Sequence, residues 1–291
     1  MLSDDKQWWR QAAIYQIYPR SFKDSNGDGI GDLKGITSQI PYLASLHLDA
    51  VWLSPFYPSA LADGGYDVDD YRDVDPKLGT LDDFDEMLRE LHKAGIRLFV
   101  DIVPNHSSNL HVWFKEAIAS EPGSAARNRY IFRDGKGPNG ELPPTNWPSH
   151  FEPSAWTHER EMGGKHNQWY CHLFAKEQPD WNWDNREVEE DFLKTLKFWS
   201  DRGVDGFRID VAHAMKKDLS EPLRDQAKYP GFNNPMTGDD VLFDRNEVHE
   251  VFREWRKLFN QYDPPRVAVA EAWVRPERVW MYAQPDELGQ A

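Results

Sequence analysis

The stretch GFRIDV, residues Gly206–Val211, decides how the rest of the chain is interpreted. Its apolar residues predict a short buried strand over 207–211, which delivers one guanidinium, Arg208, and one carboxylate, Asp210. Side chains two residues apart point to the same side of a strand, so Arg208 and Asp210 share a face. A single pair of this kind is commonly a structural ion pair. An active site is favoured only if other strands also end in polar side chains.

Two other apolar stretches also end in polar side chains. Leu98–His106 (LFVDIVPNH) and Val267–Trp273 (VAVAEAW) each contain a carboxylate or a histidine at the end of the predicted strand. Two earlier strands are predicted at Ala13–Pro19 and Ala50–Phe56. Helical spacing between the strands predicts one helix over 35–47 and another that starts with a capping box at Thr80 and Asp83 and ends at Gly95. This alternation predicts an α/β fold with a parallel sheet. Strands whose polar ends meet at one edge are typical of a TIM-type (β/α)8 barrel.

Composition narrows the class of protein. The chain has 291 residues, 40% hydrophobic and 29% charged, which is ordinary for a large globular domain. A net charge of −15 argues against partners such as nucleic acid or an anionic membrane surface. The N-terminus, MLSDDKQWWR, has no apolar run, so neither a signal peptide nor a membrane span is predicted. The single cysteine, Cys171, fits a reducing cytoplasm. The sequence leaves the oligomeric state open.

Five motifs in order resemble the α-amylase superfamily of retaining glycoside hydrolases (family 13), and within it the α-glucosidase/oligo-1,6-glucosidase branch. The motifs are DGGYDV (63–68), FVDIVPNH (99–106), QPDWNWDN (178–185), GFRIDVAH (206–213) and AVAEAW (268–273). The resemblance runs from about Trp8 to the last residue. It departs from the branch at Trp181, where the branch usually has leucine.

The resemblance implies a role for each matching residue. It implies Asp210 as the nucleophile and Glu271 as the acid/base. It implies a set of substrate-binding residues: Asp63, Tyr66, His106, Phe151, Phe174, Gln178, Arg208 and Val211. In the resembled branch, a valine directly after the nucleophile goes with α-1,6 activity, and alanine or threonine with α-1,4 preference. A third family carboxylate is expected beyond Ala291.

The two catalytic carboxyl groups need opposite protonation states, because one attacks the sugar while the other donates a proton. Asp210 lies beside Arg208 in the strand, and a neighbouring cation favours the ionised carboxylate. Glu271 follows an apolar strand and has no cation near it in the sequence. We therefore expect Glu271 to stay protonated and to donate to the leaving oxygen.

The loop DSNGDGIGD, residues 24–32, has the spacing of a calcium-binding loop. Its oxygen donors lie at positions one, three, five, seven and nine: Asp24, Asn26, Asp28, the Ile30 carbonyl and Asp32. The bidentate glutamate of position twelve is absent, and a turn rich in Gly, Asn and Asp without metal is the alternative. The resembled branch holds a structural calcium ion here, so we expect Ca²⁺ or Mg²⁺ and no organic cofactor.

Residues 106–180 break the alternation of strands and helices and are rich in Gly, Pro, Asn, Trp and His. Such a long irregular stretch is usually functional, and it resembles domain B, which is inserted after strand three. Residues 1–105 and 181–291 then form the catalytic barrel. They supply only about five of the eight strands of a closed barrel. We therefore expect the N-terminal part of a longer enzyme, inactive by itself.

The predicted function is that of a retaining α-glucosidase. It would release glucose from short α-1,4- or α-1,6-linked oligosaccharides, with a small-molecule α-glucoside as its partner. Transglycosidases similar to sucrose isomerase or trehalose synthase are an open alternative, because the residues that distinguish them are expected beyond this chain. Non-catalytic homologues of the amino-acid transporter heavy-chain type are a second alternative. They require a membrane segment and can lack the two carboxylates.

Overall fold

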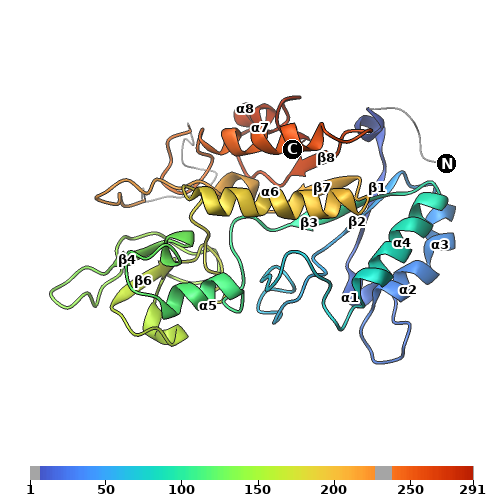
Figure 1. Cartoon of the computed structure of the whole chain (residues 1–291). Helices are drawn as coiled ribbons and strands as arrows, with labels where there is room; N and C mark the ends of the chain where they lie inside the picture. Colours follow the sequence, from blue (N-terminus) through green and yellow to red (C-terminus); the bar gives the residue numbers. More distant parts are fainter. Residues whose placement is uncertain (1–6, 227–237, 291) are drawn as a thin grey trace.

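The computed structural model describes residues 7–226 and 238–290, and a parallel sheet forms its centre (Figure 1). The strands lie in the order β1-β2-β3-β7-β8-β9, and every neighbouring pair is parallel. Their bounds are β1 Ile14–Ile17, β2 Ala50–Leu53, β3 Arg97–Ile102, β7 Gly206–Ile209, β8 Val267–Ala270 and β9 Gly289–Gln290. Five of these strands are those predicted. The short β9 was not predicted, because two residues are too few to form an apolar run.

The register of the sheet brings polar side chains together. All six residues of β3 are buried, Asp101 among them. Asp101 lies opposite Arg208 of β7, and Arg208 lies opposite Val269 of β8. Because the strands are parallel, their carboxyl ends reach the same edge. Residues that follow β3, β7 and β8 therefore meet at one edge of the sheet.

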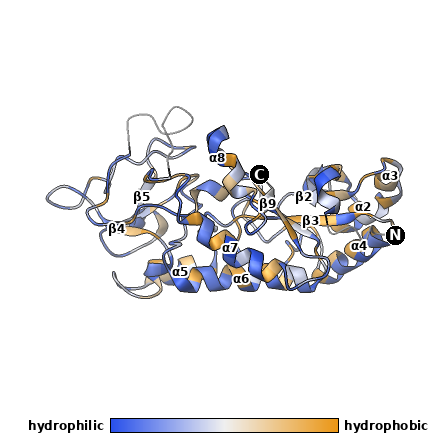
Figure 2. Ribbon diagram, turned by 90° about the horizontal axis from the view of Figure 1, so that it is seen from above, coloured by the Kyte–Doolittle hydropathy of each residue, from blue (hydrophilic) through white to orange (hydrophobic). Residues whose placement is uncertain are grey.

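Amphipathic helices cover the sheet, and Figure 2 shows hydrophilic and hydrophobic residues mixed along each of them. The main ones are α4 Leu81–Lys93, α6 Arg186–Asp201 and α7 Val248–Phe259. The predicted capping box of α4 is present: Thr80 Oγ1 accepts the Asp83 N–H at 3.2 Å, and Asp83 Oδ2 accepts the Thr80 N–H at 3.0 Å. Such caps satisfy N–H groups that the first helical turn leaves without a partner.

The helix predicted over 35–47 is instead two short helices, α2 Leu33–Ser38 and α3 Ile40–Ser45. Gln39 separates them with a ψ angle of 4°. Pro41 explains the break, because proline has no N–H to bond the carbonyl of Thr37 in a continuous helix, whereas it is tolerated in the first turn of a new one. Two further short helices are α1 Pro19–Phe22 and α8 Pro276–Tyr282.

The segment predicted as the inserted domain carries a second, antiparallel sheet beside the end of the central sheet (Figure 1). Its three antiparallel strands are β4 Phe132–Asp134, β5 Trp156–His158 and β6 Gln168–Cys171, and its helix is α5 Val112–Ala119. Trp181 is buried at the base of this segment and stacks on Tyr130, with 4.3 Å between ring centroids. The position where the sequence departs from the branch is therefore filled by an aromatic stack.

Short 3-10 helices complete the chain: η1 Trp8–Gln11, η2 Arg127–Arg129, η3 Glu159–Met162 and η4 Ala212–Ala214. Asp210 and Val211 separate the last of them, η4, from β7, the strand that carries Arg208. Within residues 7–226 and 238–290, none of the helices combines the length and the apolar character needed to span a membrane.

Candidate active site

The candidate site lies where β7 and β8 end. Asp210 is the first residue after β7, and its N–H donates to the Ile102 carbonyl of β3 at 2.8 Å. Glu271 is the first residue after β8, and its N–H donates to the Ile209 carbonyl at 2.9 Å. The hydrogen-bond ladder thus continues one residue beyond each strand. Both carboxyl groups are held by the sheet at its C-terminal edge, where barrels of this kind place their active sites.

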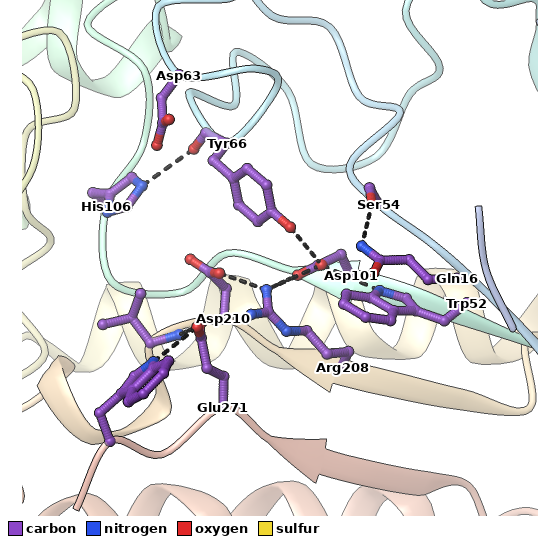
Figure 3. A network of polar contacts seen from close by, with 12 residues as sticks. Gln16, Trp52, Ser54, Asp63, Tyr66, Asp101, His106, Arg208, Asp210 and Glu271 are labelled. Atoms are coloured by element: carbon purple, nitrogen blue, oxygen red, sulfur yellow. Dashed lines mark hydrogen bonds and ion pairs between the residues drawn. The ribbon is translucent and has the colours of Figure 1, made fainter. Parts of the chain in front are cut away.

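Arg208 lies at the centre of three carboxyl groups (Figure 3). Its Nη1 is 2.5 Å from Asp210 Oδ1 and 3.1 Å from Asp101 Oδ2. Its Nη2 is 2.7 Å from Glu271 Oε2. The guanidinium also lies 5.2 Å from the centroid of the Trp52 ring. One planar cation therefore bridges the carboxyl groups that follow β7 and β8 and the one inside β3.

The predicted protonation of the two carboxyl groups is wrong for this conformation. Burial and the charge of Asp101 raise the pKa of Asp210 well above its usual value, and Arg208 only opposes this shift. Burial alone would raise the pKa of Glu271, but the charge of Arg208 and hydrogen bonds from Trp273, Val211 and Asp210 lower it. The sequence did not reveal the cation beside Glu271, because Arg208 belongs to the neighbouring strand. Glu271 is thus the ionised member of the pair here.

Asp101 is fully buried and is surrounded by donors. It accepts hydrogen bonds from the Tyr66 hydroxyl and from the Trp52 indole, both at 3.2 Å (Figure 3). Burial raises the pKa of Asp101 to about 7, against the opposing charge of Arg208. Asp101 therefore links the Tyr66 hydroxyl to the Arg208 guanidinium.

A second polar cluster joins the motifs DGGYDV, FVDIVPNH and QPDWNWDN. His106 Nε2 is 3.2 Å from the Tyr66 carbonyl, and Gln178 Nε2 is 3.0 Å from Asp63 Oδ2. Asn105 Nδ2 is 3.1 Å from His106 Nδ1 and Gln178 Nε2 is 3.0 Å from His106 Nε2, so a neutral ring, which has one acceptor nitrogen, accepts from only one of the two amides. Burial lowers the pKa of His106 and favours that neutral form. Figure 3 shows Asp63, Tyr66 and His106 along one side of the carboxyl groups of Asp210 and Glu271.

Two aromatic rings of the predicted insertion border this cluster. The ring of Phe174 lies 5.1 Å from that of His106, and Phe151 meets Phe174 edge-on at 5.4 Å. Phe151 is 58% exposed, so it lies at the outer border. The structure thus brings together the predicted sugar-binding residues of four separate motifs, with Phe151 farthest out.

Val211 has an unusual backbone. It lies in the left-handed region with φ 46° and ψ 42°, which is strained for a β-branched residue. Such strain costs about 1–3 kcal/mol and is concentrated at functional sites. In this turn the Val211 N–H donates to Glu271 Oε2 at 3.1 Å. The N–H of Ala212 donates to the Glu271 carbonyl at 3.0 Å. The turn after Asp210 therefore holds Glu271 in place.

Lys217 is an important residue that the sequence analysis missed. Its ammonium group and the carboxyl group of Asp180 are fully buried and 3.0 Å apart. It also donates to Asn105 Oδ1 at 3.1 Å and to the Ala214 carbonyl at 2.8 Å. Lys217 thus links the ends of β3 and β7 to the end of the insertion, next to His106 and Gln178. A lone lysine carries no spacing signal, so no sequence pattern indicated this role.

The predicted calcium loop is folded around its own backbone. Asp24 accepts N–H groups from Asn26, Gly27 and Gly29, at 2.6 to 3.0 Å. Asp32 caps α2 by accepting the Gly35 N–H at 2.6 Å. Within the described parts of the chain, no three His, Cys, Asp or Glu side chains are grouped to hold a metal ion. In this conformation the carboxylates of Asp24 and Asp32 accept backbone N–H groups of the loop and of α2, and calcium binding stays a prediction.

Together, the parallel sheet and the carboxyl groups at its C-terminal edge are those of one part of a (β/α)-barrel fold. The family model for the alpha amylase catalytic domain matches residues 16–291. The chain belongs to this α-amylase family.

Three similar proteins show the range within the family. The oligo-1,6-glucosidase of Parageobacillus thermoglucosidasius is 43% identical over 282 residues, which are 97% of this chain and 48% of that protein. The trehalose-6-phosphate hydrolase of Bacillus licheniformis superposes with a TM-score of 0.85 at 38% identity, over 97% of this chain and 48% of that one. The trehalulose synthase of Pseudomonas mesoacidophila also superposes with a TM-score of 0.85 at 38% identity, over 97% of this chain and 48% of that one. This chain spans about half the length of the curated relatives it matches.

Proposed function

We propose that the whole protein containing this chain is a retaining α-glucosidase that hydrolyses short α-linked glucosides. The observation that carries the proposal is the pair of carboxyl groups, Asp210 and Glu271, at the ends of adjacent strands and bridged by Arg208. Retaining glycosidases use such a pair, one as nucleophile and one as acid/base. The oligo-1,6-glucosidase relative supports the substrate class.

In this mechanism Asp210 attacks C1 of the glucose as Glu271 protonates the leaving oxygen. Water then cleaves the bond between C1 and Asp210, and Glu271 takes a proton from that water. The first step requires a protonated Glu271. In the site without substrate, however, the pKa of Asp210 is raised and that of Glu271 is lowered, which favours the proton on Asp210. We infer that the positive charge developing at C1 stabilises the ionised form of Asp210, so that the shared proton resides on Glu271 during the reaction.

The glucose itself would be held by the second polar cluster. Asp63, His106 and Gln178 offer a carboxylate, an imidazole and an amide, and Gln178 Nε2 lies 3.0 Å from both Asp63 Oδ2 and His106 Nε2. Tyr66 and Phe174 offer ring faces, on which sugars stack. Because these groups come from three motifs on one side of the carboxyl pair, we propose that they bind the non-reducing glucose. Attack there releases one glucose at a time.

Transglycosylation is the second candidate, because the trehalulose synthase is as similar in structure and identity as the hydrolase. A non-catalytic role is disfavoured by the presence of both Asp210 and Glu271. A location in the cytoplasm is also proposed, on the basis of the single cysteine, Cys171, which is buried and unpaired with any other cysteine.

The test is to give the whole protein maltose, isomaltose, sucrose and trehalose 6-phosphate in turn and to follow the products by NMR. We expect glucose from maltose or isomaltose, appearing first as the α-anomer because configuration is retained. Sucrose isomers as the main products would favour the transglycosidase. Release of the β-anomer, or no turnover of any α-glucoside, would contradict the proposal.

A further inference from the structure

Glu271 accepts hydrogen bonds at both of its carboxylate oxygens. Oε2 lies 2.7 Å from Arg208 Nη2 and 3.1 Å from the Val211 nitrogen, and both donors belong to β7 or the turn after it. Oε1 accepts the indole N–H of Trp273 at 3.0 Å. The donor on Oε1 therefore comes from the segment of Glu271 itself, two residues further along the chain.

Trp273 has both a fixed backbone and an accessible ring. Its backbone N–H is directed at His213 Nδ1, 3.4 Å away, and His213 is buried in η4, just after Val211. The side chain of Trp273 is nonetheless 57% exposed, although it bonds a half-buried carboxylate. A tryptophan that served only packing would bury its ring. The hydrogen bond to Glu271 is the feature of this side chain that calls for an explanation.

We propose that Trp273 is a positioning residue for Glu271: its indole N–H fixes Oε1 and favours the carboxylate form of the acid/base. This inference rests on the proposed function and extends it. A hydrogen bond to the charged form of an acid stabilises that form. The carboxylate is what the second half of the reaction needs, when Glu271 removes a proton from water. The water oxygen bonds to C1 as the bond from C1 to Asp210 breaks and its electron pair returns to Asp210.

The other charged and titratable groups around Glu271 have to be distinguished from this effect. Among the described residues they are Arg208, Asp210 and His213, with Asp101 on the far side of Arg208. Burial lowers the pKa of His213 to about 4, so its ring stays neutral at higher pH. Asp101, with a pKa of about 7, does titrate in the range of interest. Its contribution is the same in variants that change only Trp273.

The test compares Trp273→Phe with the wild-type whole protein. Phenylalanine keeps an aromatic ring and removes the N–H. We expect the basic limb of the pH profile of kcat/KM for isomaltose or maltose to move up by about one pH unit, because Glu271 loses a donor to its charged form. Trp273→Leu should show the same shift and, in addition, any loss due to the ring. Trp280→Phe is the matched control, because Trp280 is 59% exposed and bonds a backbone carbonyl instead of a carboxylate.

A second measurement does not depend on turnover. A ¹³C NMR titration of glutamate side-chain carboxyl groups, with Glu271→Gln to identify the resonance, gives the pKa of Glu271 directly. We expect it to rise in Trp273→Phe and to stay unchanged in Trp280→Phe. An unchanged titration in Trp273→Phe, or a shift in Trp273→Leu alone, would overturn the role of the N–H. A shifted titration in a protein that hydrolyses no α-glucoside would support this role and contradict the proposed function instead.

Discussion

Arg208 sets the electrostatics of the site, because its guanidinium serves three carboxyl groups, those of Asp101, Asp210 and Glu271. One positive charge does not neutralise three carboxylates in a buried site, so part of this cluster stays protonated near neutral pH. The raised pKa values of the buried Asp101 and Asp210 express this excess of negative charge. Burial and mutual repulsion thus favour the protonated forms of Asp101 and Asp210, and the charge of Arg208 opposes this.

Glu271→Gln tests the acid/base role at the level of one residue. The amide cannot donate a proton to a leaving oxygen, so maltose hydrolysis should fall by about 10²- to 10⁴-fold. Hydrolysis of p-nitrophenyl α-glucoside should fall less, because nitrophenolate leaves without being protonated. The measurement is kcat/KM for both substrates, with Glu277→Gln, an exposed change in α8, as the control. Equal losses for the two substrates would argue against the assignment.

Val211→Thr tests linkage preference. Val211 is buried between the candidate nucleophile and an apolar cluster that includes Trp147 and Phe243, so its side chain is part of the wall near Asp210. Valine at this position goes with α-1,6 activity in the resembled branch, and we expect the wild type to hydrolyse isomaltose. In Val211→Thr the ratio of kcat/KM for maltose to that for isomaltose should increase. A wild-type protein inactive toward isomaltose would show that this prediction is wrong.

At the scale of elements, the predictability of each feature depended on how local its cause is. The capping box of α4 and the strand that carries Arg208 depend on neighbouring residues, and both were predicted. The break between α2 and α3 also has a local cause, Pro41, which the helical periodicity outweighed in the prediction. The contact of Arg208 with Glu271 depends on the pairing of β7 with β8. Residues far apart in the sequence make that contact, so the sequence did not indicate the cation beside Glu271.

The loop before α2 is the element in which metal binding is still a prediction. Hydrogen bonds from the N–H groups of Gly27 and Gly29 lower the pKa of Asp24, which keeps the loop anionic. We expect EDTA to lower the melting temperature and Ca²⁺ to restore it. A cation at about 100-fold above its Kd stabilises the native state by about 2.7 kcal/mol, which corresponds to several degrees.

Two variants make this calcium experiment specific. Asp28→Ala should remove the response to calcium, because it deletes one of the predicted oxygen donors. Asp82→Asn, an exposed change at the start of α4, should keep the response. A wild-type melting temperature that is the same in EDTA and in calcium would favour the metal-free turn.

At the scale of the whole molecule, the motifs were sufficient to predict the fold, whereas the outer strands of the sheet were identified only in the structure. β1 and β9 are the outer strands of the sheet that the described residues form. An outer strand offers unpaired N–H and carbonyl groups to a further strand. The relatives are about twice as long as this chain. For this reason every proposal on activity here concerns the whole protein and is to be tested on it.

The most direct test of the central claim is to trap the glycosyl-enzyme. The whole protein is incubated with 5-fluoro-α-D-glucosyl fluoride, which slows breakdown of the covalent intermediate, and is then digested and analysed by mass spectrometry. The account predicts one added fluoroglucosyl group on the peptide that contains Asp210, and no labelling of Asp210→Asn. A label on a different carboxylate, or rapid α-glucoside turnover by Asp210→Asn, would contradict it.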